Sequence, residues 1–334
     1  MTLPTLLTGY RTSGPFHLGH YFGMMNNTLE LAKTSQAFVM AADVQTLTDH
    51  FDNPQKVRDN VLEATIDMLS MNFDLDSTTF FIQSQIPAIA ELTVFFSNLV
   101  SLNRVLRNPT VKTEIDQKKA IFGEHGESVN FGFVGYPVSQ AADILFLRAN
   151  IVPTGDDQAP MIELSRDIAE KFNSVYSTEL FQLPEIRLTK VTRLPGLDGN
   201  AKMSKSLNNA IYISDSEEET ISKIKSAKTD SGSTLEFDPI NRPDISNLVT
   251  LFALVNDIDE ATAVKDLVGI GYGTFKAKLA ASINDHFRLI RERRQEWSSK
   301  PDKVKEVLEI GRQRTLVRAE ATMQLVRAAM KIDY

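Results

Sequence analysis

Residues 13–23 read SGPFHLGHYFG, and this stretch decides the fold because it lies between a short apolar run and a helical pattern. The apolar run, residues 3–8, predicts a strand, and residues 21–31 predict a helix. The first N–H groups of a helix have no partner inside it, and the helix dipole adds positive potential there. A glycine-rich turn between a strand and a helix therefore favours a bound phosphate. His17 and His20, three residues apart, would share one face of that helix and donate to phosphate oxygens.

Taken alone, this turn has other interpretations. It also fits a glycine-rich turn that carries two surface histidines. A metal site formed by the two rings fits less well, because no third ligand lies nearby in the sequence. The choice depends on a second element far downstream, Lys202-Met203-Ser204-Lys205-Ser206. Two lysines in one short polar loop supply the positive charge that a reacting phosphate needs, so we interpret the two elements together.

The composition is that of a chain that can bury a substantial core. It has 334 residues, of which 42% are hydrophobic, enough for one large or two modest domains. No apolar run approaches the roughly 20 residues of a membrane-spanning helix, and the first residues lack the basic segment of a signal peptide. The lack of cysteine excludes disulfides and thiolate metal sites. We expect a cytoplasmic protein without membrane contact.

The charges are distributed unevenly along the chain. The formal net charge is −7, which argues against a wholly basic nucleic-acid-binding protein. In residues 271–334, however, 14 Lys and Arg outnumber 8 Asp and Glu, whereas in residues 1–270 they are outnumbered 22 to 35. A basic C-terminal part is compatible with a nucleic-acid contact and also with the solvated face of a helix. Charge alone favours the solvated face.

The first half of the chain alternates apolar runs with helical patterns. Strands are predicted at residues 3–8, 37–43, 78–83, 151–154 and 186–189. Continuous apolar runs are typical of strands that are covered on both faces. The predicted fold class is therefore α/β, with a Rossmann-like, doubly wound parallel sheet and a helical C-terminal domain. In such sheets ligands bind at the carboxyl ends of the strands, where the turn at residues 13–23 lies.

Helix boundaries are predicted from capping residues. Asn53 and Pro54 open one helix, as its cap and its first residue. Ser214 and Glu217 have the spacing of a capping box, and beyond them only helices are predicted. The last two helices, residues 274–297 and 302–331, are long and charged.

Several segments carry a resemblance to a known family. His17-Leu18-Gly19-His20 is similar to the HIGH motif of class I aminoacyl-tRNA synthetases, and residues 202–206 match their KMSKS loop in full. The order and separation of the two motifs fit the small subclass that handles aromatic amino acids. Residues 136–144 (YPVSQAADI), 152–158 (VPTGDDQ) and 163–169 (ELSRDIA) resemble the tryptophanyl-tRNA synthetases. The similarity extends from about residue 6 to the C-terminus.

The resemblance implies two domains and a set of partners. Residues 1–200 would form a Rossmann-like catalytic domain, completed by the C-terminal helix at about residues 302–334. Residues 201–301 would form a helical domain that binds the tRNA anticodon and opens with the KMSKS loop. The partners would be tRNA(Trp), L-tryptophan and ATP. The protein would be a homodimer that meets through the apolar segment 92–106, although this segment fits plain core packing nearly as well.

The implied reaction joins L-tryptophan to ATP, giving tryptophanyl-adenylate and pyrophosphate, and then transfers tryptophan to tRNA(Trp). The attacking carboxylate is ionised at neutral pH, so no general base is needed. The reaction needs positioning and positive charge on the α-phosphate and the leaving pyrophosphate. The expected catalytic residues are His17, His20, Lys202 and Lys205. Mg²⁺ would arrive with ATP, and we expect no metal site built from the protein alone.

The implied ATP site combines three segments: the turn after the first strand, the turn at residues 155–158 and the KMSKS loop. In the family the second turn holds the ribose of ATP, where a carboxylate can accept from sugar hydroxyls. An Asp-rich helix cap would explain one of its two aspartates better than both. Arg11 stands where many relatives have Gln. The expected ATP-binding residues are Arg11, Thr12, Ser13, Gly19, His20, Gly155, Asp156, Asp157, Leu194, Lys202, Met203, Ser204, Lys205 and Ser206.

Asp143 is the residue expected to select the amino acid. It lies in an apolar helical pattern, so its carboxylate would accept from an indole N–H in a mostly dry pocket. A site built on such a bond discriminates strongly against ligands that lack the donor. The alternative is a buried Asp whose bonds are satisfied by the backbone. The other expected tryptophan-binding residues are Gln140, Leu7, Gly9, Gln45, Tyr136 and Gln158.

Three alternatives stay open at this point. A tyrosyl-tRNA synthetase would share Asp143 and usually carries the Gln found at position 140, and Gln45 stands where many relatives have His. Against tyrosine, Leu7 lacks a hydroxyl to meet a phenol, and Ala142 leaves room for a bicyclic ring. A non-catalytic, synthetase-like binding protein would usually have lost some of the motifs. A nucleotidyltransferase that binds no tRNA would be shorter.

Overall fold

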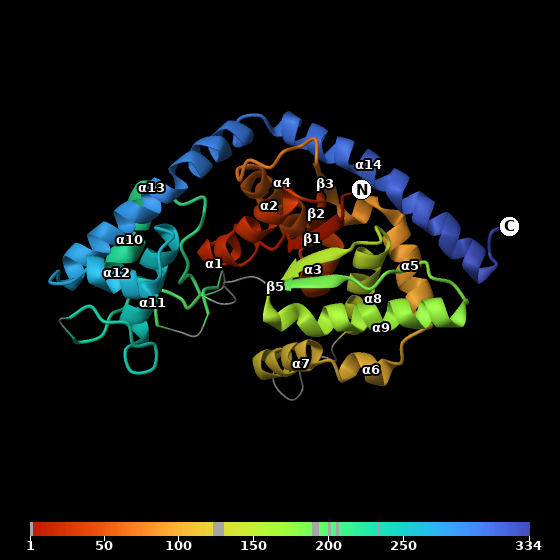
Figure 1. The fold of residues 1–334 in the computed structure, drawn as a ribbon, viewed down its shortest axis with the longest axis horizontal. Coiled ribbons are helices and arrows are strands. Elements are labelled where there is room, and N and C mark those ends of the chain that lie inside the picture. Colours follow the sequence, from red (N-terminus) through yellow and green to blue (C-terminus); the bar gives the residue numbers. More distant parts are fainter. Residues whose placement is uncertain (1–2, 123–129, 189–193, 200–201, 205–206, 233) are drawn as a thin grey trace.

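The computed structural model describes residues 3–122, 130–188, 194–199, 202–204, 207–232 and 234–334. Five parallel strands form one sheet in the order β3-β2-β1-β4-β5 (Figure 1). This confirms the predicted α/β class, because β1 lies in the centre and the order reverses there. The strands are β1 (Thr5–Arg11), β2 (Gln36–Ala42), β3 (Thr78–Ile82), β4 (Ile151–Thr154) and β5 (Glu185–Leu188).

Helices connect the strands and then make up the C-terminal part of the chain. Those between the strands are α1 (Leu18–His20), α2 (Asn26–Ala32), α3 (Asp43–His50), α4 (Pro54–Leu69), α5 (Pro87–Ser97), α6 (Leu102–Leu106), α7 (Pro109–Phe122), α8 (Phe131–Leu145) and α9 (Ala159–Val175). A π-helical turn, Tyr21–Met25, joins α1 to α2. The C-terminal helices are α10 (Glu217–Ser226), α11 (Pro243–Val255), α12 (Glu260–Asp266), α13 (Tyr272–Ser298) and α14 (Pro301–Met330). Within these ranges no helix is long and apolar enough to cross a membrane.

Both faces of the sheet are buried. Successive residues of a strand point to opposite faces, so Leu6 belongs to one hydrophobic cluster and Leu7 to the other. The first cluster contains α4 and continues without a break into helices α10–α13. The second contains α5, α8 and α9. The C-terminal helices therefore share a core with one face of the sheet, and the division into two domains stays a prediction.

The last helix, α14, crosses the β3 edge of the sheet (Figure 1). Its first half contributes Val304 to the first cluster, and its second half contributes Met323 to the second. Between them Gly311 lies so close to the strand that an added Cβ would be 1.7 Å from the carbonyl oxygen of Phe80. Only glycine allows this approach. Arg318 on α14 also donates to Thr5 at 2.8 Å.

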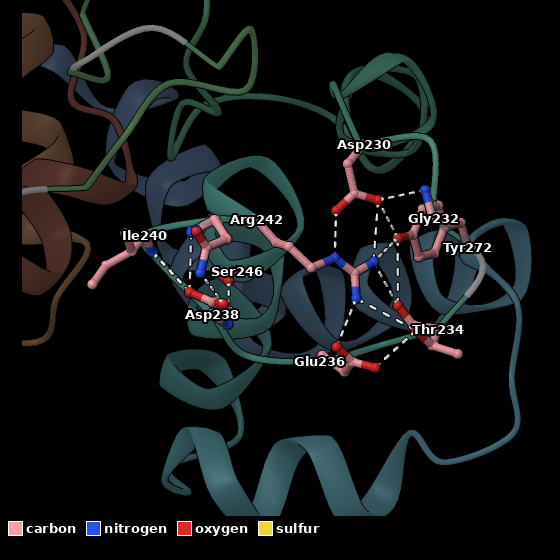
Figure 2. Close-up of polar contacts among 10 residues, drawn as sticks. Asp230, Gly232, Thr234, Glu236, Asp238, Ile240, Arg242, Ser246 and Tyr272 are labelled. Atoms are coloured by element: carbon pink, nitrogen blue, oxygen red, sulfur yellow. Dashed lines mark hydrogen bonds and ion pairs between the residues drawn. The ribbon is translucent and has the colours of Figure 1, made fainter.

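The connection between α10 and α11 is held by Arg242. Its guanidinium binds Asp230 at 2.8 Å, the Thr234 carbonyl at 2.9 Å and Glu236 at 3.2 Å (Figure 2). Tyr272, the first residue of α13, also donates to Asp230. The hydrogen bonds from Arg242 hold the pKa of Asp230 well below its usual value. One cation thus ties this connection to the start of α13.

Two predicted boundaries need correction. The central strand runs through Arg11 rather than ending at residue 8, because Gly9, Tyr10 and Arg11 continue the pairing with β2. The capping box forms at Ser216 and Glu219, two residues beyond the predicted pair. Asp215 accepts from the Tyr212 N–H at 2.7 Å and binds Lys223, which keeps residues 212–215 in a turn. The helix at Asn53 and Pro54 and the two long last helices are confirmed.

Candidate active site

A cavity of about 860 Å³ opens at the carboxyl ends of β1 and β4. The expected site residues that line it are Gly9, Arg11, Ser13, His17, Gly19, His20, Gln45, Tyr136, Gln140, Gly155, Gln158, Leu194, Lys202, Met203 and Ser204. Leu7, Thr12 and Asp143 are buried behind the lining, and Asp156 is exposed outside it. Lys205, Ser206 and the Asp157 side chain lie outside the described residues. Segments separated by most of the chain therefore share one cavity.

The two histidines are fixed by each other and by the backbone. His17 is the N-cap of α1, and its Nδ1 accepts the Gly19 N–H at 3.1 Å. The His17 N–H in turn donates to Nδ1 of His20 at 3.2 Å, and the ring centroids lie 3.9 Å apart. Since both Nδ1 atoms act as acceptors, a neutral ring carries its proton on Nε2. In the neutral form of each histidine the ring N–H is thus on Nε2, the nitrogen that does not bind the backbone.

A buried carboxylate binds the backbone of this turn. Asp67 on α4 is fully buried, and its Oδ2 accepts the N–H of Phe16 at 3.1 Å. Its Oδ1 accepts from Nε of Arg294 on α13 at 2.7 Å. Burial raises the pKa of Asp67, while Arg294 and the Phe16 N–H act in the opposite direction. An ion pair with α13 therefore holds the residue before His17.

A second tie joins the turn to α13. Nδ1 of His286 lies 2.9 Å from the Val255 carbonyl, and Nε2 lies 2.8 Å from the hydroxyl of Tyr21. A carbonyl can only accept, so Nδ1 carries the proton and Tyr21 donates to Nε2. Burial lowers the pKa of His286, which favours this neutral form. The π-helical turn after His20 is thus anchored by a neutral hydrogen bond.

The histidine turn also pairs with the segment that follows the lysine motif. His17 and Tyr212 form an antiparallel bridge. The Leu18 N–H donates to the Ile211 carbonyl at 3.0 Å, and the Ile213 N–H donates to the Phe16 carbonyl at 2.9 Å. Two motifs that are distant in the sequence are therefore joined through the backbone.

In the described part of the lysine motif, residues 202–204, the backbone is anchored and the Lys202 side chain is exposed. Met203 is buried, and its N–H donates to the Leu194 carbonyl at 2.9 Å. Lys202 is exposed and lines the cavity. The buried methionine thus fixes the segment, while the lysine before it stays available to an anion.

Asp143 lies under the other half of the cavity and has a neutral partner. It is 2% exposed, and both of its oxygens accept from Nε2 of Gln83, at 2.8 and 3.0 Å. Gln83 is fixed in turn, because its Oε1 accepts the Gln45 N–H at 3.0 Å. Burial raises the pKa of Asp143 to about 8, although the bonds from Gln83 lower it. The alternative interpretation expected Asp143 to be satisfied by the backbone, but its partner is the side chain of Gln83.

The wall next to Asp143 offers further acceptors. The Tyr136 hydroxyl donates to Glu114 at 2.7 Å, and burial, followed by this bond, raises the pKa of Tyr136. Oε1 of Gln140 is buried and has no hydrogen-bond partner within the described part of the chain. Arg11, near this wall, pairs with Asp49. The wall can therefore receive a cationic or hydrogen-bonding group of a ligand.

Sequence reasoning missed Asp67, Gln83 and Glu114. None of them belongs to a motif, and each meets its partner across at least 22 residues of chain. The only available signal was a charged Asp in the apolar pattern of α4. Among the described residues, no group of three or more His, Cys, Asp or Glu could hold a metal ion.

Comparisons with known proteins agree with this geometry. A family model described as tRNA synthetases class I (W and Y) matches residues 3–288. The curated tryptophan–tRNA ligase of Streptococcus pyogenes serotype M1 is 42% identical over 344 aligned residues, which cover 100% of both chains.

Solved structures give the same result. The tryptophanyl-tRNA synthetase from Campylobacter jejuni, complexed with ADP and tryptophan, has a TM-score of 0.83 at 32% identity and covers 98% of this chain and 99% of its own. The enzyme from Mycoplasma pneumoniae has a TM-score of 0.85 at 25% identity, covering 99% of this chain and 98% of its own. The similarity therefore includes both the sheet and the C-terminal helices.

Proposed function

The chain belongs to the class I tRNA synthetases for tryptophan and tyrosine, and we propose how its residues perform the reaction of a tryptophan–tRNA ligase. The enzyme activates L-tryptophan with ATP to tryptophanyl-adenylate and pyrophosphate, and then transfers tryptophan to tRNA(Trp). The observation that carries the choice of tryptophan is the 42% identity to a tryptophan–tRNA ligase over both full lengths.

The phosphates of ATP bind between the histidine turn and the lysine segment. Nε2–H groups of His17 and His20 donate to phosphate oxygens, because both Nδ1 atoms already accept from the backbone. Lys202, which lines the same cavity, adds positive charge for the leaving pyrophosphate. The ribose lies at the turn of Gly155 and Asp156, and Lys205 has a role like that of Lys202. Mg²⁺ enters with the phosphates, as it commonly does with nucleotides.

Tryptophan binds at the other half of the cavity. Its indole N–H donates to Asp143, whose position is fixed by Gln83. Burial raises the pKa of Asp143 to about 8 in the absence of a ligand. Because the ionised carboxylate is the better acceptor, binding of the indole N–H favours loss of this proton near neutral pH. The ammonium group of the substrate binds Tyr136 and Oε1 of Gln140, which has no partner among the residues that the structure describes. These contacts bring the substrate carboxylate to the α-phosphorus.

The chemical step needs no proton transfer at the nucleophile. A carboxylate oxygen attacks the α-phosphorus, a new P–O bond forms, and the bond to the bridging oxygen of pyrophosphate breaks. The residues act by holding the two reactants in line and by neutralising the charge that develops on the leaving group. Fixed histidines and an exposed lysine are suited to these two tasks.

The remaining assignments concern partners and location. The helical region at residues 201–301 binds the tRNA anticodon, and its basic C-terminal neighbours contact phosphates. Two copies form a homodimer through the segment 92–106, where Val94 and Leu102 are 64% and 60% exposed. The enzyme works in the cytoplasm. Salt-dependent tRNA binding and the molar mass in solution test the first two assignments.

The decisive experiment is amino-acid-dependent exchange between ATP and pyrophosphate, with tryptophan and tyrosine in parallel. We expect rapid exchange with tryptophan and little with tyrosine, and a loss of at least about 100-fold in kcat/KM for tryptophan in Asp143→Ala, because the acceptor is removed. Preference for tyrosine would refute the pocket assignment. No exchange from folded protein with either amino acid would favour a non-catalytic relative.

A further inference from the structure

We propose that Asn209 is the positioning residue that sets where Lys202 lies relative to the histidine turn. This inference rests on the proposed function, in which Lys202 acts on the phosphates of ATP. Asn209 belongs to neither motif and does not line the cavity. Its role is to hold the backbone of the lysine segment.

The Asn209 side chain binds both ends of the described lysine segment. It is 4% exposed, and its Oδ1 accepts the Ser204 N–H at 2.8 Å. Its Nδ2 donates to the Lys202 carbonyl at 3.1 Å and to Asp198 at 2.9 Å. A primary amide can accept and donate at the same time, which neither a carboxylate nor an apolar side chain of this size can do. The residue type is thus required by the three bonds.

The segment before the motif is shaped to admit this amide. A Cβ added to Gly196 would lie 2.0 Å from Nδ2 of Asn209. The Asn209 carbonyl also accepts the Leu197 N–H at 2.9 Å. Residues on both sides of Lys202 therefore converge on one side chain, and Gly196 has to be glycine for that side chain to fit.

The backbone that follows Asn209 is held in place by burial and by a hydrogen bond to the histidine turn. The residues that follow it, Ala210 and Ile211, are buried, and the Ile211 carbonyl accepts the N–H of Leu18 in the histidine turn. One side of Asn209 is therefore fixed relative to His17, and the other side holds Lys202. Changing this amide changes the distance between the two groups without altering either of them.

The chemical consequence follows from the need for positioning. Misplacing a group by about 1 Å at a reacting centre can lower the rate about 100-fold. We expect Asn209→Ala to lower kcat/KM for ATP in pyrophosphate exchange by about 10- to 100-fold. The KM for tryptophan should stay within about twofold, because the amino acid binds at the other half of the cavity. A general loss of folding would change both constants.

The matched control is Asn208→Gly. Asn208 is adjacent in sequence, exposed, and has a φ of 50°, which glycine adopts without strain. It should exchange like the wild type. Gly196→Ala, which displaces the same amide, should reproduce the Asn209→Ala defect. Asn209→Asp keeps the acceptor for Ser204 but loses both donated bonds, and provides the test if the alanine variant does not fold.

A double-mutant cycle with Lys202→Ala separates this inference from the proposed function. If Asn209 acts through Lys202, the second substitution adds little to the first. Three results would each overturn the positioning role. They are additive losses in kcat/KM for ATP in the double variant, an equally large rise in the KM for tryptophan, and unchanged exchange in Asn209→Ala and Asn209→Asp. Loss of exchange in the wild type would instead refute the proposed function, and normal exchange in Lys202→Ala would refute the assigned role of that lysine.

Discussion

Two buried carboxylates lie beneath the two halves of the cavity, and they have opposite kinds of partner. Asp67, under the histidine turn, binds the cation of Arg294 and the Phe16 N–H. Asp143, under the half of the cavity that we propose binds tryptophan, accepts only from the neutral amide of Gln83 among its described hydrogen bonds. Both are shielded from water, so burial raises the pKa of each.

The difference between these partners distinguishes a structural carboxylate, Asp67, from the carboxylate that we propose binds the substrate, Asp143. A cationic partner compensates the charge and fixes the geometry, so Asp67 has nothing further to bind. A neutral amide does not compensate a negative charge on Asp143, so burial raises its pKa to about 8 and the carboxyl keeps its proton near neutral pH. A ligand that donates an N–H to Asp143 would stabilise the ionised form. The less stable arrangement thus lies on the side that we propose recognises the substrate.

The largest expected effect is on how stability depends on pH. Between about pH 4 and 8, folded Asp143 holds a proton that the unfolded chain has lost, so the stability of the wild type falls as pH rises through this window. Asp143→Asn removes this dependence. At about 1.4 kcal/mol per pKa unit, the difference between the two proteins should change by an amount on the order of 5 kcal/mol across the window.

The measurement is urea denaturation of both proteins at intervals of pH. Other groups titrate in both and cancel in the difference. Parallel stability curves would show that Asp143 titrates as an ordinary exposed carboxyl and would remove the contrast with Asp67.

The next effect concerns Asp67. Asp67→Ala leaves Arg294 without its buried partner and the Phe16 N–H without an acceptor, which should lower the free energy of unfolding by about 3–5 kcal/mol. The control is Glu63→Gln, because Glu63 binds the same arginine from an exposed position and should cost about 1 kcal/mol or less. Equal losses in the two variants would mean that burial of the pair contributes nothing.

The smallest effect tests the neutral tie to α13. Tyr21→Phe removes the hydrogen bond to His286 but keeps the ring, and should cost about 1 kcal/mol. Thermal unfolding measures this loss, with exchange activity as the second readout. Activity should stay near that of the wild type, because the ion pair at Asp67 still holds the turn. A large fall in exchange activity in Tyr21→Phe would show that the ion pair at Asp67 does not hold the turn without this hydrogen bond.

The sequence predicted what local pattern encodes. Alternating apolar runs gave the parallel sheet, and the spacing in residues 13–23 gave the strand-to-helix turn. The predicted capping box was wrong because Ser214–Glu217 and Ser216–Glu219 have the same spacing, and the bonds of Asp215 to Tyr212 and Lys223 decide between them. Gln83 and Asp67 could not be found, since each acts through a contact with a residue far away in the sequence. Asn208 and Asn209 suggest a hinge after the lysine motif, whereas the Asn209 side chain holds that segment by three hydrogen bonds.

The passage of α14 along β3 sets the order in which the protein can be completed during its synthesis. The ribosome delivers Phe80 of the edge strand β3 early, and Gly311 only after more than two hundred further residues. At synthesis rates of about 5–20 residues per second, the edge of β3 stays uncovered for on the order of ten seconds or longer before α14 has been made. Such an edge is a template for pairing with another nascent chain. The need for chaperone protection is therefore greatest while the last helix is still being made.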